Sequence, residues 1–183
     1  MAIIASEILF KLSTGNSGSQ GNNAAQGNVN NSLGKYISTT PVTDASLNNL
    51  FDDLTGDENA QGASYVDYRC IFVHNNNGSL TLQNAVMWLS AEVAGGAAIA
   101  IGVDPAAASA IGSGTQQAAV ILTDTSAPAG VTFSAPTTKG AGIALGNIPN
   151  GQCRAIWVRR TAANSSALNN DGATIRVEGD TAA

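Results

Sequence analysis

His74 is the only histidine in the sequence, so a hydrolase of the Ser-His-Asp type would have to use it as its general base. It stands where an apolar run meets the polar sequence Asn75-Asn76-Asn77-Gly78, and no nucleophile elbow or other serine motif accompanies it. A solvated turn histidine is the simpler interpretation. We therefore predict that the protein is not an enzyme, with a hydrolase of cell-wall polymers as the alternative class.

Four carboxylates that lie close together in the sequence are candidate oxygen ligands for calcium: Asp52, Asp53, Asp57 and Glu58. Their spacing is not that of a recognised calcium loop, and a helix end followed by an acidic turn in water explains them more simply. No motif places two acidic residues on one cleft, as glycoside cleavage would require. We predict no metal, no cofactor and no catalytic residue.

Aromatic and basic side chains are the remaining candidates for binding. Trp88 and Trp157 lie in long apolar runs, which favours a place in the core over an exposed platform for sugars. Arg159 and Arg160 are neighbours in an expected strand and must point to opposite faces. At least one of them is available to an acidic partner surface, and a plain solvated face is the alternative.

Cysteine usage and the first residues bear on the compartment in which the protein works. Cys70 and Cys153 both lie in apolar runs, where a free thiol behaves as a small buried hydrophobe, although a disulfide between them stays open at this point. The opening MAIIASEILFKLS has no basic leader, and no window approaches the roughly 18 apolar residues of a membrane span. We expect no ordinary secretion signal and no membrane partner.

Charge is scarce in this sequence. Charged residues make up 11% of the chain, whereas about 25% is usual for a soluble domain. The formal net charge is -5 and the sequence pI is near 4.5, so a groove that follows nucleic-acid phosphates is not expected. The 183 residues fit one domain, residues 1–183, with a surface rich in hydroxyl and amide groups.

Alternation of apolar and polar residues predicts strands along most of the chain. Residues 65–92 read as two long strands joined by the Asn-rich turn, a central hairpin. Turn signals separate the other expected strands, and residues 169–172 form one such signal. Eight or nine strands predict an all-β, jelly-roll-like β-sandwich. Apart from the hairpin, the expected strands span residues 3–12, 97–103, 118–122, 131–134, 152–161 and 173–178.

Two segments depart from the strand pattern. Residues 43–54 place Leu47, Leu50, Phe51 and Leu54 at helical spacing behind Thr43 or Asp44 as N-cap, which predicts one short helix. Residues 13–34 form a long Gly/Asn-rich arm without periodicity, expected to be mobile in the free protein. Such an arm is a candidate contact element, with a plain surface loop as the alternative.

The residues expected to contact a partner follow from these features. They lie in the arm, directly after it, or in the expected strand 152–161. They are Ser13, Asn16, Asn22, Asn28, Lys35, Tyr36, Arg159 and Arg160.

Five stretches resemble tailed-bacteriophage virion proteins of the capsid decoration or cement type: 31–38 (NSLGKYIS), 50–52 (LFD), 68–75 (YRCIFVHN), 154–161 (RAIWVRRT) and 171–179 (DGATIRVEG). The resemblance implies a protein made in the cytoplasm of a bacterial host and located on the outer capsid surface of the virion. It would bind the major capsid protein as a homotrimer and stabilise the mature shell, with no direct contact to nucleic acid. The alternative is a tail, baseplate or fibre module that binds a host-surface glycan.

Overall fold

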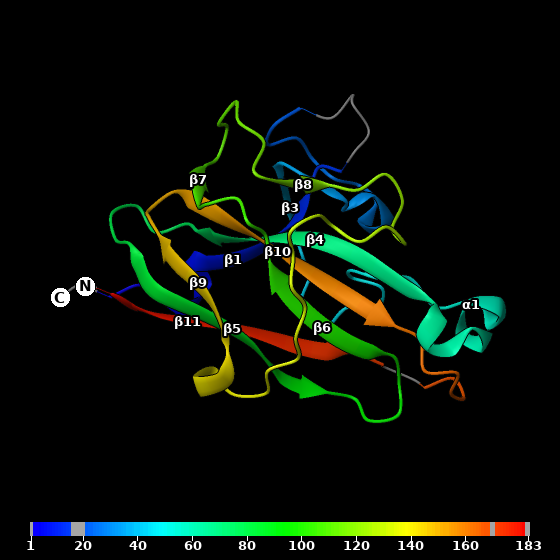
Figure 1. The fold of residues 1–183 in the computed structure, drawn as a ribbon. Helices are drawn as coiled ribbons and strands as arrows, with labels where there is room; N and C mark the ends of the chain where they lie inside the picture. Colours follow the sequence, from blue (N-terminus) through cyan, green and yellow to red (C-terminus); the bar gives the residue numbers. More distant parts are fainter. Residues whose placement is uncertain (1, 16–20, 169–170, 182–183) are drawn as a thin grey trace.

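The structure, a computed structural model, describes residues 2–15, 21–168 and 171–181. These residues are mostly β-strands with one short α-helix, which confirms the all-β prediction. Three sheets are present, with the orders β3-β1-β4-β10-β6 (β7 also pairs with β10), β11-β5-β9 and β2-β8 (Figure 1). The strands are β1 (Ile8–Ser13), β2 (Gly34–Lys35), β3 (Ile37–Pro41), β4 (Val66–Asn75), β5 (Leu82–Glu92), β6 (Ala98–Val103), β7 (Ser109–Ala110), β8 (Ala118–Val120), β9 (Ile143–Ile148), β10 (Gln152–Thr161) and β11 (Ala173–Thr181).

The large sheet is covered on both faces. Along β4, Ile71 and Val73 belong to one hydrophobic cluster, whereas Cys70 and Phe72 belong to a second. The first cluster joins the large sheet to β5 and β9, and the second joins it to β2, β8 and their loops. Full burial of one large apolar side chain contributes about 2–3 kcal/mol, so two such clusters suit a chain that has few charges. The buried members from the covering elements are Leu82, Ala85, Met87, Leu89, Leu145 and Ile148 on one side, and Leu33, Ala118 and Ile121 on the other.

The two strands of the expected central hairpin exist, but they do not pair with each other. β4 lies in the large sheet and β5 in the three-stranded sheet, so residues 76–81 cross from one layer to the other. Asn75 holds this crossing, because its Nδ2 donates to the carbonyls of Leu80 (2.8 Å) and Ile148 (2.9 Å). The hairpin prediction was wrong because β4 is apolar on both faces and needs a layer above it as well as neighbours beside it.

The expected helix at 43–54 is also absent, since this segment consists of turns. Ala45 and Asn48 have positive φ values of 55° and 54°, which interrupt an α-helix. The one α-helix, α1 (Gly56–Ala60), follows directly, with Thr55 as N-cap and Glu58 completing a capping box. The apolar residues 50 and 51 of the turn segment instead pack singly against the core.

The remaining predicted strands, except the one at 131–134, are present with shifted ends. The first strand begins at Ile8 because residues Ala5–Glu7 form a 3-10 turn, η1. Segment 131–134 contributes an isolated bridge between Ser134 and Ile101 instead of a strand. Short 3-10 turns also occur at η2 (Val29–Asn31), η3 (Gly62–Ser64) and η4 (Lys139–Ala141). Half of the turn signal expected at 169–172 lies outside the described residues.

Candidate contact surface

The described parts of the Gly/Asn-rich segment, residues 13–15 and 21–34, are hydrogen-bonded to the large sheet; residues 16–20 lie outside the described residues, and the predicted mobility of the arm stays a prediction. We call residues 21–33 the strap. Its centre is Gln26, which is 2% exposed and donates through Nε2 to the carbonyls of Ser13 (3.2 Å) and Thr14 (3.1 Å). The Gln26 backbone N–H donates to Oγ1 of Thr40 (2.9 Å), and its Oε1 accepts from the N–H of Asn28 (3.1 Å). One buried amide therefore ties the strap to β1 and β3.

The end of the strap is anchored by two buried serines. The N–H of Ser13 donates to Oγ of Ser32 (2.9 Å), and Ser32 Oγ donates to the carbonyl of Cys70 in β4 (2.6 Å). Gly34 donates its N–H to Oγ of Ser13 (2.8 Å). Ser13 is fully buried and serves here as an internal anchor, so its expected contact with a partner stays a prediction.

A charged cluster under the strap supplies its third anchor. Arg69, whose side chain is fully buried, donates from Nη2 to Oδ1 of Asn30 (2.9 Å) and lies 3.3 Å from an Asp124 carboxylate oxygen. Asn30 in turn donates to Oδ2 of Asp52 (3.1 Å). The Arg69 guanidinium lies over the Phe51 ring, 5.2 Å from the ring centroid. Asn30 is thereby fixed between a buried cation and a surface carboxylate.

Arg160 belongs to the same cluster and is not a free contact residue. It donates from Nε and Nη2 to the two carboxylate oxygens of Asp67, at 3.1 and 2.7 Å. Its guanidinium also lies 4.7 Å from the Phe51 ring centroid. Burial raises the pKa of Asp67, and the hydrogen bonds and charge of Arg160 oppose that shift. In the isolated chain Arg160 is paired with Asp67, and the expected contact of Arg160 with a partner surface stays a prediction.

The other expected contact residues are spread over the molecule. Asn22 donates from Nδ2 to the carbonyl of Ser113, and Asn28 caps η2 by accepting from the N–H of Asn30 (2.9 Å). Lys35 and Tyr36 are half-buried, with the Lys35 ammonium 5.5 Å from the Tyr36 ring centroid. Their neighbour across β2 and β8 is the 109–120 segment. These residues and the strap lie on one outer layer of the molecule.

Two expected contact residues lie elsewhere. Arg159 is half-buried with its guanidinium 5.4 Å from the Phe133 ring centroid, and Phe133 packs on Tyr68. Arg159 therefore lies against the 104–134 segment. Asn16 lies outside the described residues.

Two buried polar residues that sequence reasoning missed hold the strap's layer to the sheet. Asp104 accepts from Nε1 of Trp157 (2.8 Å) and from the N–H of Ala119 (2.9 Å). Gln117 accepts from the N–H of Ile37 (3.1 Å) and donates to Oγ of Ser109 (2.9 Å). A carboxylate directly after the apolar run 97–103 was the available signal for Asp104, because a charge at that place needs partners.

His74 is a buried strand residue and not the solvated turn histidine that was expected. It is 4% exposed in β4, and burial lowers the pKa of its imidazole to about 4, with Lys11 adding to the shift. Its Nδ1 has no hydrogen-bond partner within the described residues. His74 is therefore a neutral core residue near pH 7.

The cysteine and tryptophan predictions are confirmed. Cys70 and Cys153 are buried free thiols, and β-pairing places them opposite Trp157 and His74, respectively, instead of each other. Burial raises the pKa of the Cys153 thiol to about 12, so it stays protonated. Trp88 and Trp157 are buried.

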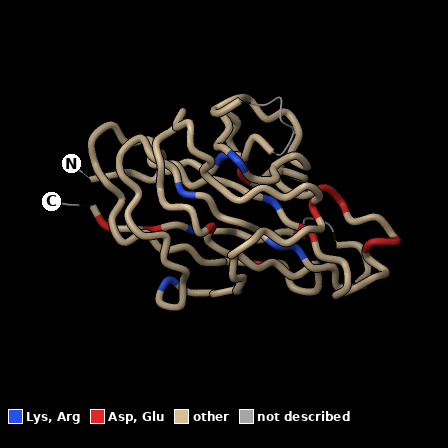
Figure 2. The backbone as a smooth tube through the Cα atoms, turned by 45° about the horizontal axis from the view of Figure 1, so that its top comes forward, with Lys and Arg blue, Asp and Glu red and all other residues tan. Residues whose placement is uncertain are grey.

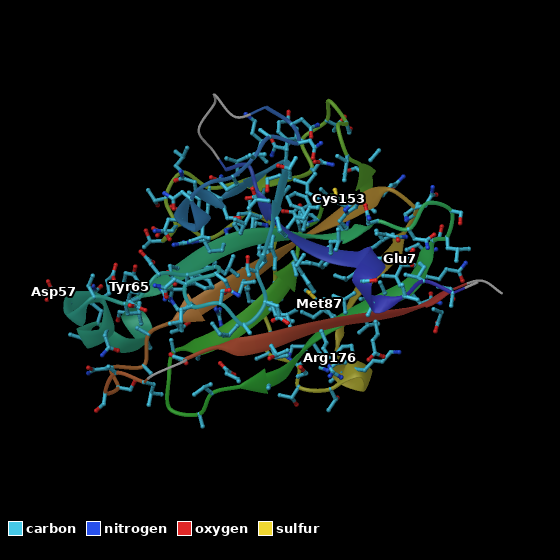
Figure 3. All side chains as sticks on the ribbon, turned by 180° about the vertical axis from the view of Figure 1, so that it is seen from behind. Glu7, Asp57, Tyr65, Met87, Cys153 and Arg176 are labelled. Atoms are coloured by element: carbon cyan, nitrogen blue, oxygen red, sulfur yellow. The ribbon has the colours of Figure 1, made fainter. Side chains whose placement is uncertain are left out.

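The acidic residues 52–58 gather near α1 at one end of the molecule (Figure 2). Asp52 faces the arginines of the charged cluster, whereas Glu58 accepts from the Tyr65 hydroxyl (2.7 Å), which lowers the pKa of Glu58. Figure 3 shows Tyr65 and Asp57 together at this end. Within residues 2–15, 21–168 and 171–181, no group of three potential metal ligands converges.

Two shallow hollows of about 240 Å³ each interrupt the surface. One separates the strap from the 43–49 loop, and the other separates residues 3–8 from β11. Among the helices of the described chain, none has the length and apolar character needed to cross a membrane. No family model, curated protein or solved structure matches this chain.

Proposed function

We propose that the protein is a structural component of a tailed-bacteriophage particle that binds the outer surface of the capsid and stabilises the mature shell. The resemblance in the strand and strap sequences is one support. The observation that carries the proposal is the strap itself: a Gly/Asn-rich segment that three sets of buried anchors hold against the large sheet. A jelly-roll relationship of the sandwich and a homotrimeric state are parts of the proposal.

The chemistry of the strap suits a protein surface as its partner. Asn23, Ala25, Asn28 and Asn31 are exposed on it, whereas Gln26, Ser32 and the Arg69 cluster hold it from below. Because the described part of the strap is already ordered, binding does not have to supply the entropy of ordering it. A neutral surface of amide and backbone groups fits the major capsid protein through hydrogen bonds and close packing, without strong long-range charge attraction.

Stabilisation of the shell then follows from mass action. A protein that binds the mature, expanded lattice better than the unexpanded or broken lattice shifts the equilibrium towards the mature shell. Trimer symmetry at local threefold positions would let several weak contacts act together. This role requires no cofactor and no direct contact with nucleic acid or membrane.

The decisive experiment is cryo-electron microscopy, with icosahedral averaging, of purified particles of the phage that encodes the chain. Ordered density for the chain over the whole shell, with the strap against the major capsid protein, is the expected result. Absence from the averaged shell, together with a low copy number by quantitative mass spectrometry, would overturn it. That outcome would favour the tail, baseplate or fibre alternative, for which binding to host glycans is the next assay.

A further inference from the structure

Strand β11 has an open edge. It is nine residues long and lies at the end of the sheet order β11-β5-β9, with β5 as its one neighbour. Among the described residues, no strand pairs with its other side. A strand at the edge of a sheet presents a row of unpaired backbone N–H and C=O groups, which can pair with a strand from another chain.

The edge is also regular. The pairing of β11 with β5 shifts register twice, and each time the extra residue is on β5. In the first shift, Thr174 and Ile175 face Ala91 and Leu89. In the second, Glu178 and Asp180 face Val86 and Gln83. β11 contains no proline, no lysine and no bulge of its own, the features that commonly block an edge. Its side chains alternate strictly, with residues 174, 176, 178 and 180 exposed and 175, 177, 179 and 181 half-buried.

A hollow lies on the inner side of this edge. Its walls include Ile4, Ile8, Leu82 and Val177, and Ile4 is 61% exposed. Gly179 also lines the hollow, and a Cβ there would lie 2.6 Å from the carbonyl oxygen of Gln83, so no larger residue fits at this position. A partner strand therefore finds backbone groups at the edge and an apolar recess for an inward-facing side chain beside it.

The charges on the exposed face are complementary in the register that pairs β11 with a second copy over its whole length. If two copies of β11 pair antiparallel about a twofold axis at Val177, Arg176 of each copy lies opposite Glu178 of the other. The same register places Ile175 of one copy opposite Gly179 of the other, beside the hollow. An axis at residue 176 would oppose two arginines, one at residue 178 would oppose two glutamates, and one at residue 179 would oppose Glu178 and Asp180.

We infer that the partner of this edge is a second copy of the chain, and that two copies pair through β11 about a twofold axis at Val177. The two three-stranded sheets become one continuous six-stranded sheet, and Ile175 of each copy enters the hollow of the other. Figure 3 shows the Arg176 side chain on the outer side of β11 and Met87 on the inner side, so the charged pairs stay at the surface. Glu178, which is 3.1 Å from Lys139, keeps this neighbour in the pair.

The test is a charge swap in the full-length protein, read by sedimentation equilibrium across a concentration series. Arg176→Glu and Glu178→Arg each create two like-charge pairs across the axis, and each is expected to raise the dimer dissociation constant by about tenfold or more. The double variant R176E/E178R restores opposite charges and should restore dimerisation. The E178R change removes the contact with Lys139 in both the single and the double variant. If loss of that intramolecular contact caused the weaker dimerisation, the double variant would therefore not restore it.

Asp53→Arg is the matched control, since it reverses an exposed acidic residue far from β11 in the chain and should leave the dissociation constant unchanged. Far-ultraviolet circular dichroism establishes that each variant is folded. A wild-type protein that stays monomeric, or an oligomer whose mass is insensitive to both single reversals, overturns the inference. The assay contains no capsid, so its result does not depend on whether the protein is a virion component. If the protein also forms trimers through another surface, the β11 variants would still sediment with a mass above that of the monomer.

Discussion

At the scale of single residues, the buried polar groups distinguish this protein more than its surface does. Asp67, Arg69, Asp104 and Gln117 are buried in a chain with few charges. Each joins two segments that are distant in the sequence, as when Asp104 accepts from the Trp157 indole. A buried polar group whose partner is removed is strongly unfavourable, so these residues make the correct arrangement of layers more stable than the alternatives.

The Asp67–Arg160 pair is the sharpest case. We predict that Asp67→Leu alone destabilises the protein by about 3–5 kcal/mol, because it leaves the Arg160 guanidinium without its main partner in a buried place. Arg160→Met should have a similar effect. The double variant should be much less destabilised than the sum of the two, as measured by urea unfolding. Additive losses would show that the two side chains act independently.

His74 gives a prediction for pH. The pKa of His74 is about 4 in the folded protein, whereas the ordinary value for histidine is 6.5. Between pH 4 and pH 6.5, the unfolded chain therefore binds more protons than the folded chain. Stability contributed by neutral His74 is therefore present above pH 6.5 and is lost as the pH falls towards 4, with a limiting slope of about 1.4 kcal/mol per pH unit. The change to leucine, His74→Leu, should flatten the unfolding free energy across this window. An unchanged slope in H74L would assign the pH dependence to other groups.

At the scale of elements, most of the long strands could be predicted, whereas β3, β9 and the short strands β2 and β7 were missed and the pairing of β4 and β5 was wrong. Alternation is a local signal, so β4, β5, β6 and β10 were found close to their true bounds. Whether β4 pairs with β5 depends instead on apolar residues on both faces of β4, which need a second layer. The helical spacing at 43–54 was misleading because Leu50 and Phe51 each pack on the core from a turn, and φ at Ala45 and Asn48 is positive.

The hydrogen bonds that hold the strap could not be predicted from its composition. Its Gly, Asn and Gln residues add almost nothing to an apolar core, so hydropathy predicts a mobile arm. Its order comes from hydrogen bonds of Gln26, Ser32 and Asn30 to β1, β4 and the Arg69 cluster, and such pairings depend on three-dimensional contacts. The burial of the candidate contact residues was hidden from the sequence for the same reason: Asn28 is exposed on the strap, whereas Ser13 and Arg160 are buried anchors. Whether any of them contacts a partner stays a prediction.

The anchoring role of Gln26 can be tested directly. We predict that Gln26→Ala lowers the unfolding free energy by about 1–3 kcal/mol, because the carbonyls of Ser13 and Thr14 lose a buried donor. Amide hydrogen exchange should rise in residues 21–33 by more than in β4 or β10. Gln61→Ala is the matched control, since that glutamine is exposed and makes one long bond of 3.4 Å to the Asp57 carbonyl. Equal exchange in the strap of both variants would contradict the anchoring role.

At the scale of the whole molecule, the two outer layers differ in chemistry. One consists of the strap and the 104–134 segment, with few charges and many amide and hydroxyl groups. The other is the sheet β11-β5-β9, whose outer face carries Arg176, Glu178 and Asp180 and whose edge is open. Under the two proposals above, the protein would use the strap's layer to bind the capsid and the edge of the other layer to bind a second copy of itself.

The proposed division of labour predicts that bulk added to the two layers has different effects. Ala25→Trp places a large side chain on the exposed surface of the strap. This side chain would prevent close packing between the strap and a partner protein. Binding to purified mature shells, measured by co-sedimentation, should fall at least about tenfold, since close packing at the centre of an interface carries most of its free energy. Ala144→Trp adds the same bulk to exposed β9, in the opposite layer, and should bind as the wild type does. Both variants replace exposed alanines, so equal melting temperatures are expected and any difference in binding reflects the layer involved. A loss of binding with A144W alone would place the capsid contact on the three-stranded sheet and would leave the strap with a purely structural role.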